Sequence, residues 1–311
     1  MGEIMTPTGM WIGAGLLAVL VAATAYGMAK GKPDSGPNEF LDRVKSWWVM
    51  IGIIGLAIVL GRTATIVLFA VISYIALKEY FSIVPTRRTD RLILLLAYLA
   101  VPVQYYWVGI AWYGVFIIFV PVYMFLGLPA AMVLRGETAG FLKAAGTLHW
   151  GLMVCVFSIS HAAYLTVATD AATGEPFGVG PLVFLLIVTQ FNDVAQYMSG
   201  KTFGRHKIAP NVSPNKTVEG FAGGALATLA LSVALAGFLT PLTFMQSIAL
   251  GLALPVAGFL GDVTMSAIKR DIGVKDTGSL LPGHGGLLDR IDSLTFTAPL
   301  FFHALFYLHG A

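Results

Sequence analysis

Two short stretches near the C-terminal end place carboxylates and a cation at helical spacing. Asp262, Ser266 and Lys269 stand at i, i+4 and i+7, so on a helix they share one face. Asp289 and Asp292 stand at i and i+3 and share a face of a second helix. Helix ends that carry carboxylates can meet around a hard cation, and Mg²⁺ takes one or two carboxylates plus substrate phosphates. The spacing therefore predicts a site for Mg²⁺ and phosphate groups.

The segment 261–293 that holds these residues also supplies positive charge. Lys269, Arg270, Lys275 and Arg290 can pair with a polyphosphate. The run 282–286, with His284 at its centre, can bring backbone N–H groups close to phosphate, because glycine permits a tight approach. An ordinary polar loop would explain the Lys and Arg, but not three Asp beside a glycine run.

A second polar cluster lies about seventy residues earlier. Asp193 falls within an apolar stretch, where an ionisable residue is costly and by default marks a functional site. A buried structural hydrogen bond between helices is the alternative. In the following segment 200–217, Ser213 could cap the next helix, which would place Lys216 and Thr217 near an N-terminus that binds anions. Attraction to lipid headgroups is the other explanation for the Lys and Arg of this segment.

Composition identifies the elements that must position these side chains. Of 311 residues, 57% are hydrophobic and only 11% are charged, whereas soluble domains carry about 25% charged residues. The single cysteine, Cys155, excludes a disulfide framework and a cysteine-based zinc site. The chain is predicted to be an all-α, polytopic integral membrane protein.

Apolar segments and their flanking charges predict the topology. Ten segments are expected, of which the second is short and the fourth and fifth are barely separated: 9–29, 47–60, 64–84, 91–108, 110–128, 146–169, 178–199, 218–240, 242–261 and 293–309. Of the 19 Lys and Arg residues, all except Arg62 fall on one side of the membrane in this arrangement. The positive-inside rule makes that side cytoplasmic, with both termini outside. About nine or ten transmembrane helices are therefore expected.

The organisation that follows has two parts. Residues 1–177 would form N-terminal transmembrane helices that act as a scaffold and a lipid access route. Residues 178–311 would form the catalytic region, with cytoplasmic loops at 200–217 and 261–293.

The segment from Ser266 to Asp292 resembles the motif of the phosphatidate cytidylyltransferases, or CDP-diacylglycerol synthases. The shared positions are Ser266, Lys269, Arg270, Lys275, Asp276, Gly278, Pro282, His284, Gly285, Gly286, Asp289, Arg290 and Asp292. The stretch 213–220 resembles the same family, as does Glu79 far upstream. The family lacks Gln196 and Val218 at the matching positions, which places the lipid substrate in question.

The resemblance implies a nucleotidyl transfer in phospholipid biosynthesis. A lipid phosphate, phosphatidate first of all, would attack the α-phosphorus of CTP, giving CDP-diacylglycerol and pyrophosphate. Asp262, Asp289 and Asp292 would hold Mg²⁺, with Lys269 beside them, and a second, monovalent cation is left open. CTP would contact the remaining site residues: Asp193, Ser213, Lys216, Thr217, Glu219, Arg270, Lys275 and His284.

Other functions compete with this interpretation. A CTP-dependent enzyme that acts on another lipid phosphate or on a lipid alcohol would need the same site. A transporter would spread polar residues through many helices, whereas here they cluster in one patch. Intact Asp262, Asp289, Lys269 and His284 argue against an inactive relative. The expected partners are CTP, a lipid phosphate and the bilayer, with no nucleic acid, and a homodimer is left open.

Overall fold

The structure, a computed structural model, describes residues 15, 18, 21, 24, 25, 39–278 and 285–310. Within them the α-helices are Glu39–Leu60 (α2), Arg62–Ile83 (α3), Arg91–Gly109 (α4), Tyr113–Ile118 (α5), Phe125–Val133 (α6), Phe141–Leu152 (α7), Ile159–Tyr164 (α8), Gly180–Phe203 (α9), Val218–Leu239 (α10), Phe244–Asp271 (α11), Leu288–Ile291 (α12) and Leu294–His309 (α13). A short 3₁₀ helix, Arg88–Asp90 (η1), precedes α4. Most of the predicted first segment, 9–29, lies outside the described residues.

Six helical stretches are long and apolar enough to cross a membrane: Arg62–Ile83, Arg91–Gly109, Tyr113–Val133, Phe141–Tyr164, Val218–Leu239 and Phe244–Asp271. The third and fourth stretches each contain a π-helical turn, Phe119–Met124 (η2) and Met153–Ser158 (η3), that joins α5 to α6 and α7 to α8. The predicted class, an all-α polytopic membrane protein, is confirmed. The expected nine or ten crossings stay a prediction, because α2 and α13 hold shorter apolar stretches and α9 carries Asp193 and Lys201.

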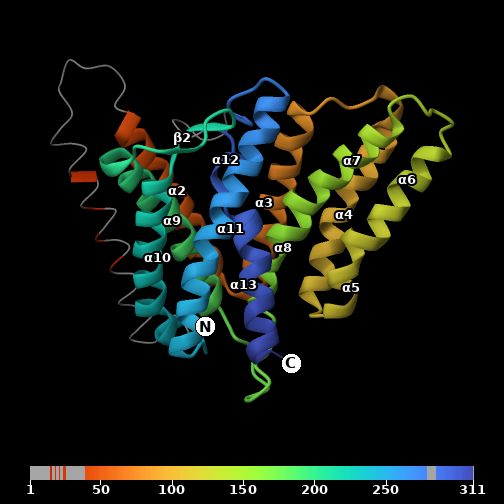
Figure 1. Cartoon of the computed structure of the whole chain (residues 1–311). Helices are drawn as coiled ribbons and strands as arrows, with labels where there is room; N and C mark the ends of the chain where they lie inside the picture. The colour runs from red at the N-terminus through yellow and green to blue at the C-terminus, as the bar shows by residue number, and fades with distance from the viewer. Residues whose placement is uncertain are drawn as a thin grey trace.

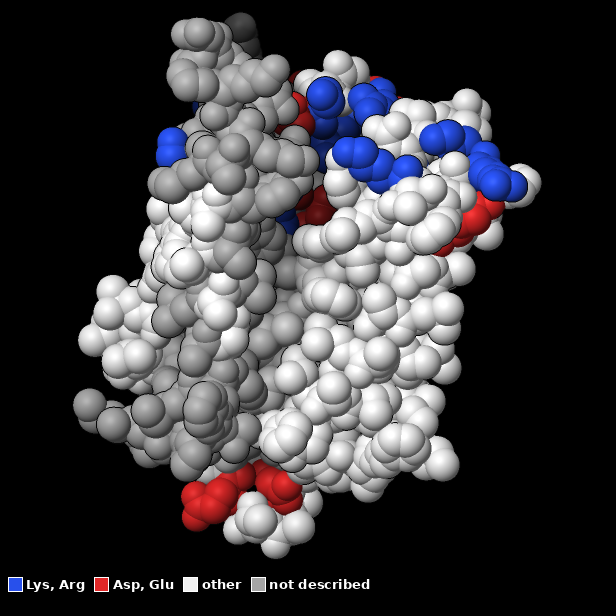
Figure 2. All heavy atoms as spheres, turned by 90° about the vertical axis from the view of Figure 1, so that its left-hand side faces the viewer, with Lys and Arg blue, Asp and Glu red and all other residues white. Residues whose placement is uncertain are grey.

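The helices lie roughly side by side, and the loops gather at the two ends of the bundle (Figure 1). On the face that Figure 2 shows, Lys and Arg gather at one end, while the opposite end carries Asp and Glu alone. We call the first the basic end. This separation is the pattern that the charge asymmetry of the sequence predicts.

Two predicted loops are shorter than expected. Helix α9 continues to Phe203 and α11 continues to Asp271, so residues 200–203 and 261–271 of the predicted loops are the last parts of helices. Between α9 and α10 the chain forms a small antiparallel hairpin of Lys207–Ala209 (β1) and Ser213–Thr217 (β2). This hairpin is a local exception to the all-α expectation.

Close packing brings the end of α11 against the start of α13. A Cβ atom at Gly261 would lie 2.5 Å from the carbonyl oxygen of Asp292, so only glycine permits this approach. The adjacent residue, Asp262, is thereby held next to Asp292. One apolar core cluster runs from Ile66 to Leu305, so the expected division at residue 177 separates two parts that share a core, and it stays a prediction.

Candidate active site

Three carboxylates from separate segments converge at the basic end of the bundle. Asp193 lies on α9, Asp262 on α11, and Asp292 between α12 and α13. The hydroxyl of Ser293 donates to Oδ1 of Asp193 at 3.0 Å, and the backbone N–H of Ser293 donates to Oδ1 of Asp292 at 2.8 Å. Burial, together with the nearby charges of Asp262 and Asp193, raises the pKa of Asp292 well above its ordinary value. Ionising all three carboxylates at once is therefore unfavourable unless a cation offsets their charge.

One lysine already offsets part of that charge. Nζ of Lys216, on β2, lies 2.5 Å from Oδ2 of Asp262, and both side chains are largely shielded from solvent. The hydroxyl of Ser266 donates to the other oxygen of Asp262 at 3.3 Å, from one turn farther along α11. Burial alone would lower the pKa of Lys216, but Asp262, together with the charges of Asp193 and Asp292, outweighs burial and the pKa is raised. Lys216 is thus a fixed positive charge inside the site.

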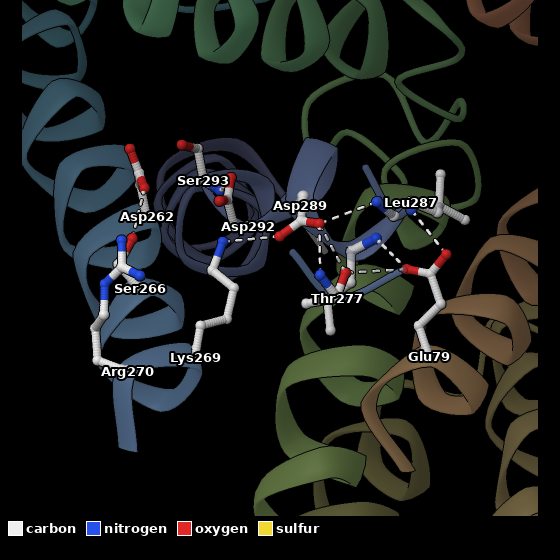
Figure 3. Close-up of polar contacts among 12 residues, drawn as sticks. Glu79, Asp262, Ser266, Lys269, Arg270, Thr277, Leu287, Asp289, Asp292 and Ser293 are labelled. Carbon is white, nitrogen blue, oxygen red and sulfur yellow. Dashed lines mark hydrogen bonds and ion pairs between the residues drawn. The ribbon is translucent and has the colours of Figure 1, made fainter. Parts of the chain in front are cut away.

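A second ion pair joins Lys269 to Asp289 (Figure 3). Nζ of Lys269 lies 2.7 Å from Oδ1 of Asp289, while Oδ2 accepts from the backbone N–H and the hydroxyl of Thr277 and from the N–H of Gly286, at 2.8, 3.0 and 3.0 Å. Burial alone would raise the pKa of Asp289, but these donors together lower it. Both oxygens of Asp289 are therefore engaged with protein donors.

Sequence reasoning left Glu79 out of the site. This residue of α3 accepts from the backbone N–H groups of Leu287 and Leu288 at 2.9 and 2.8 Å, and from the hydroxyl of Thr277 at 3.3 Å (Figure 3). Its match to the family was the only signal in the sequence, because 208 residues separate it from Leu287. Thr277 had no signal of its own.

The hairpin residues are arranged differently from the sequence expectation. Ser213 lies on β2 and does not begin a helix; the N-cap of α10 is Thr217, whose hydroxyl accepts from the N–H of Gly220 at 3.1 Å. The predicted Ser213 cap is therefore wrong by four residues. The carboxylate of Glu219 accepts from the backbone N–H groups of Arg205 and His206 at 2.9 and 3.1 Å and pairs with the His206 ring. Glu219 thereby fastens the turn before the hairpin to α10.

The remaining predicted phosphate ligands lie farther out. Arg270 is exposed, and its Nε donates to the carbonyl oxygen of Val212 at 3.4 Å, which links α11 to the hairpin. Lys275 is exposed as well. His284 lies outside the described residues, so its expected contact with phosphate stays a prediction.

Comparison with known proteins assigns the family. Residues 41–308 match the Cytidylyltransferase family. The chain belongs to this family. The resemblance found in the sequence is confirmed, and the site described above is that of a cytidylyltransferase-family membrane protein.

The relatives divide into two kinds by the extent of the match. The "Uncharacterized protein YnbB" of Escherichia coli strain K12 is 42% identical over 296 residues, which cover 94% of this chain and 97% of that protein. The phosphatidate cytidylyltransferases of Brucella suis and Bacillus subtilis are 43% and 41% identical over 137 and 133 residues, or 44% and 42% of this chain. Each of these two alignments spans 49% of the relative. Likeness to the enzymes with a stated activity is thus confined to about half of their length.

The donor set of this cytidylyltransferase-family site suits Mg²⁺, which prefers oxygen ligands. In the part of the chain that the structure describes, no three His, Cys, Asp or Glu side chains lie close enough to hold a metal ion by themselves. That does not count against the ion, because Mg²⁺ usually takes one or two carboxylates and completes its shell with substrate phosphates and water. Asp262 and the buried Asp292 beside it would be the carboxylates to hold such a cation.

Proposed function

We propose that this protein transfers the cytidylyl group of CTP to a lipid phosphate, with phosphatidate as the first candidate. An oxygen of the lipid phosphate forms a bond to the α-phosphorus of CTP, and the bond from that phosphorus to the β-phosphate bridge breaks. The products are CDP-diacylglycerol and pyrophosphate. No side-chain nucleophile is required, because positioning and charge carry most of the catalysis in this chemistry.

The observation that supports this proposal is the convergence of Asp193, Asp262 and Asp292 with Lys216 at one end of the bundle. CTP and a lipid phosphate are both anions, and they must meet beside the bilayer, where uncompensated charge is costly. Lys216 and Lys269 can neutralise phosphate oxygens if each exchanges its carboxylate partner for the nucleotide. Charge that develops on the leaving pyrophosphate is stabilised by the same cations.

Mg²⁺ would be held by Asp262 and Asp292, and it supplies positive charge to the phosphates of CTP when bound. Asp262 would give up Lys216 on Oδ2 or the Ser266 hydroxyl on Oδ1, one partner on each oxygen. Asp289, also predicted as a ligand, is held more firmly, because it would have to give up Lys269 or three donors on Oδ2. We therefore assign the metal to Asp262 and Asp292 and leave Asp289 as a third, exchangeable ligand. A second, monovalent cation and a homodimer remain expectations.

The orientation is part of the proposal. The basic end carries the site and the hairpin, so by the positive-inside rule the site would lie at the cytoplasmic face of the inner or plasma membrane. CTP would reach it from the cytoplasm and the lipid phosphate from the adjoining leaflet.

A different lipid phosphate is the second candidate, because the match to YnbB covers 97% of that protein, whereas the match to the phosphatidate enzyme of Brucella suis covers 49%. Purified protein should be given CTP, Mg²⁺ and, separately, phosphatidate, a polyprenyl phosphate and a lipid alcohol. Release of pyrophosphate with formation of a CDP-lipid supports the transfer, whereas release of CDP would reveal a kinase. If another lipid phosphate is turned over at least about tenfold faster than phosphatidate, the lipid assignment is wrong, but the reaction class stands.

A further inference from the structure

Glu79 connects α3, in the N-terminal half of the bundle, to the start of α12. Its two carboxylate oxygens accept from the consecutive N–H groups of Leu287 and Leu288 at 2.9 and 2.8 Å. These donors belong to the first turn of α12, where backbone N–H groups have no partner within the helix. A residue of α3 therefore supplies the acceptors that this turn lacks.

The same carboxylate and Asp289 hold one hydroxyl between them. Oγ1 of Thr277 lies 3.3 Å from Oε2 of Glu79 and 3.0 Å from Oδ2 of Asp289. A Cβ atom at Gly286 would lie 2.5 Å from Oε2 of Glu79 and 2.3 Å from Oγ1 of Thr277, so glycine is required for this approach. Two acidic side chains, one from α3 and one from α12, thus bind Thr277 and the backbone of residues 286–288.

The position of α12 also determines where the partner of Lys269 lies. Asp289 is the acceptor for Nζ of Lys269, and Asp292 lies three residues farther along the same short stretch. A shift of α12 would therefore move the partner of Lys269 and one carboxylate of the metal site together. In the part of the chain that the structure describes, Glu79 makes no hydrogen bond to Asp289 or Asp292, so its influence on them passes through Thr277 and the backbone of residues 286–288.

We propose that Glu79 is a positioning residue for the transfer reaction, which makes α3 a part of the reaction machinery as well as a scaffold. The role in turnover rests on the proposed function; the contact with the first turn of α12 does not. Glu79→Gln is the informative change, because it keeps the size of the side chain and turns one acceptor oxygen into an NH₂ group that faces an N–H donor. Lys78→Gln is the matched control, since Lys78 is the exposed neighbour of Glu79 on α3.

Hydrogen–deuterium exchange on the purified protein reads the contact directly. In Glu79→Gln, peptides that cover residues 285–293 should exchange about tenfold faster or more, the size expected when a hydrogen bond to a charged acceptor is lost. Peptides of α4, α10 and α13 should keep their rates, and Lys78→Gln should match the parent protein throughout. Unchanged exchange at 285–293, or an equal gain across all peptides, would show that Glu79 has no local positioning role.

Turnover gives the second reading. The rate at saturating CTP and lipid should fall about tenfold in Glu79→Gln and by less in Glu79→Asp, which retains the charge. If Glu79→Gln does not fold, Thr277→Val, which removes the shared hydroxyl alone, should show the same local exchange change. Parent-level turnover in a variant with fast exchange would overturn the catalytic part of the proposal. If the parent protein does not turn over CTP, the proposed function is contradicted. The exchange result would still test the contact between Glu79 and α12.

Discussion

Nζ of Lys216 lies 2.5 Å from Oδ2 of Asp262, although one residue belongs to a hairpin strand and the other to the end of a long helix. The pair fastens the hairpin to α11, and Arg270 adds a second link through the carbonyl oxygen of Val212. In the proposed reaction the same lysine also has to serve the nucleotide. The pair is therefore expected to matter twice, once for the fold and once for turnover.

These two roles can be separated with a double-mutant cycle. Lys216→Gln or Asp262→Asn alone leaves one largely shielded charge without its partner, so each should lower the melting temperature of the detergent-purified protein. The double variant should lose less stability than the sum of the two single losses, because the interaction between the two side chains is then removed only once. Activity should not recover, since the metal ligand and the phosphate partner are both gone. Strictly additive losses of stability would contradict the coupling.

The metal assignment predicts a particular pattern of activity loss. Asp262→Asn and Asp292→Asn should each reduce turnover by a factor of about 10² or more, as loss of a major transition-state electrostatic contact does. The control is Asp271→Asn, which changes an exposed residue on the same helix as Asp262 and should retain activity. Turnover measured against Mg²⁺ concentration should show that the two site variants need more of the ion. Near-parental activity of both variants at low Mg²⁺ would remove these residues from the metal site.

Local patterns in the sequence predicted much of this site, and contacts between distant residues account for what they missed. The spacing of Asp262, Ser266 and Lys269 placed them on one helical face, and α11 bears that out by running to Asp271. The hairpin was missed because its strands have three and five residues, too few to show a period. The Ser213 cap failed because Thr217, four residues later, has the same capping chemistry, and only the hairpin decides between them.

The role of Glu79 could not be derived from spacing. Its partners are backbone N–H groups, which every non-proline residue carries. No side-chain pattern at residues 287 and 288 therefore predicts the contact. Asp289 was predicted as a metal ligand from its residue type and its motif. The structure adds four donors that contact its carboxylate, and the motif alone does not predict these contacts.

Those donors predict a pH dependence of stability. The pKa of Asp289 is lower in the folded protein than in the unfolded chain, so its ionised form favours folding. That contribution is complete above the ordinary pKa of aspartate, about 3.9, and is lost as the pH falls through the lower folded value. Without Mg²⁺, the melting temperature of Asp289→Asn should stay below that of the parent by a constant margin from pH 8 to about pH 5. The margin should narrow below about pH 4; a margin that widens there would contradict the sign.

The last prediction concerns the side of the membrane on which the site lies. Arg205 and Lys275 are exposed just after the ends of α9 and α11, and Glu175 is exposed in the loop between α8 and α9, at the opposite end of the bundle (Figure 1). Single-cysteine variants at these three positions, made in a Cys155→Ala background, can be treated in intact cells with a thiol reagent that does not cross membranes. If the basic end is cytoplasmic, Glu175→Cys is labelled at once, whereas Arg205→Cys and Lys275→Cys react only after the cells are opened. Labelling of either basic-end position in intact cells, with Glu175→Cys protected, would reverse the orientation and require CTP to reach the site from outside. Because CTP is a cytoplasmic nucleotide, that result would also argue against the proposed reaction.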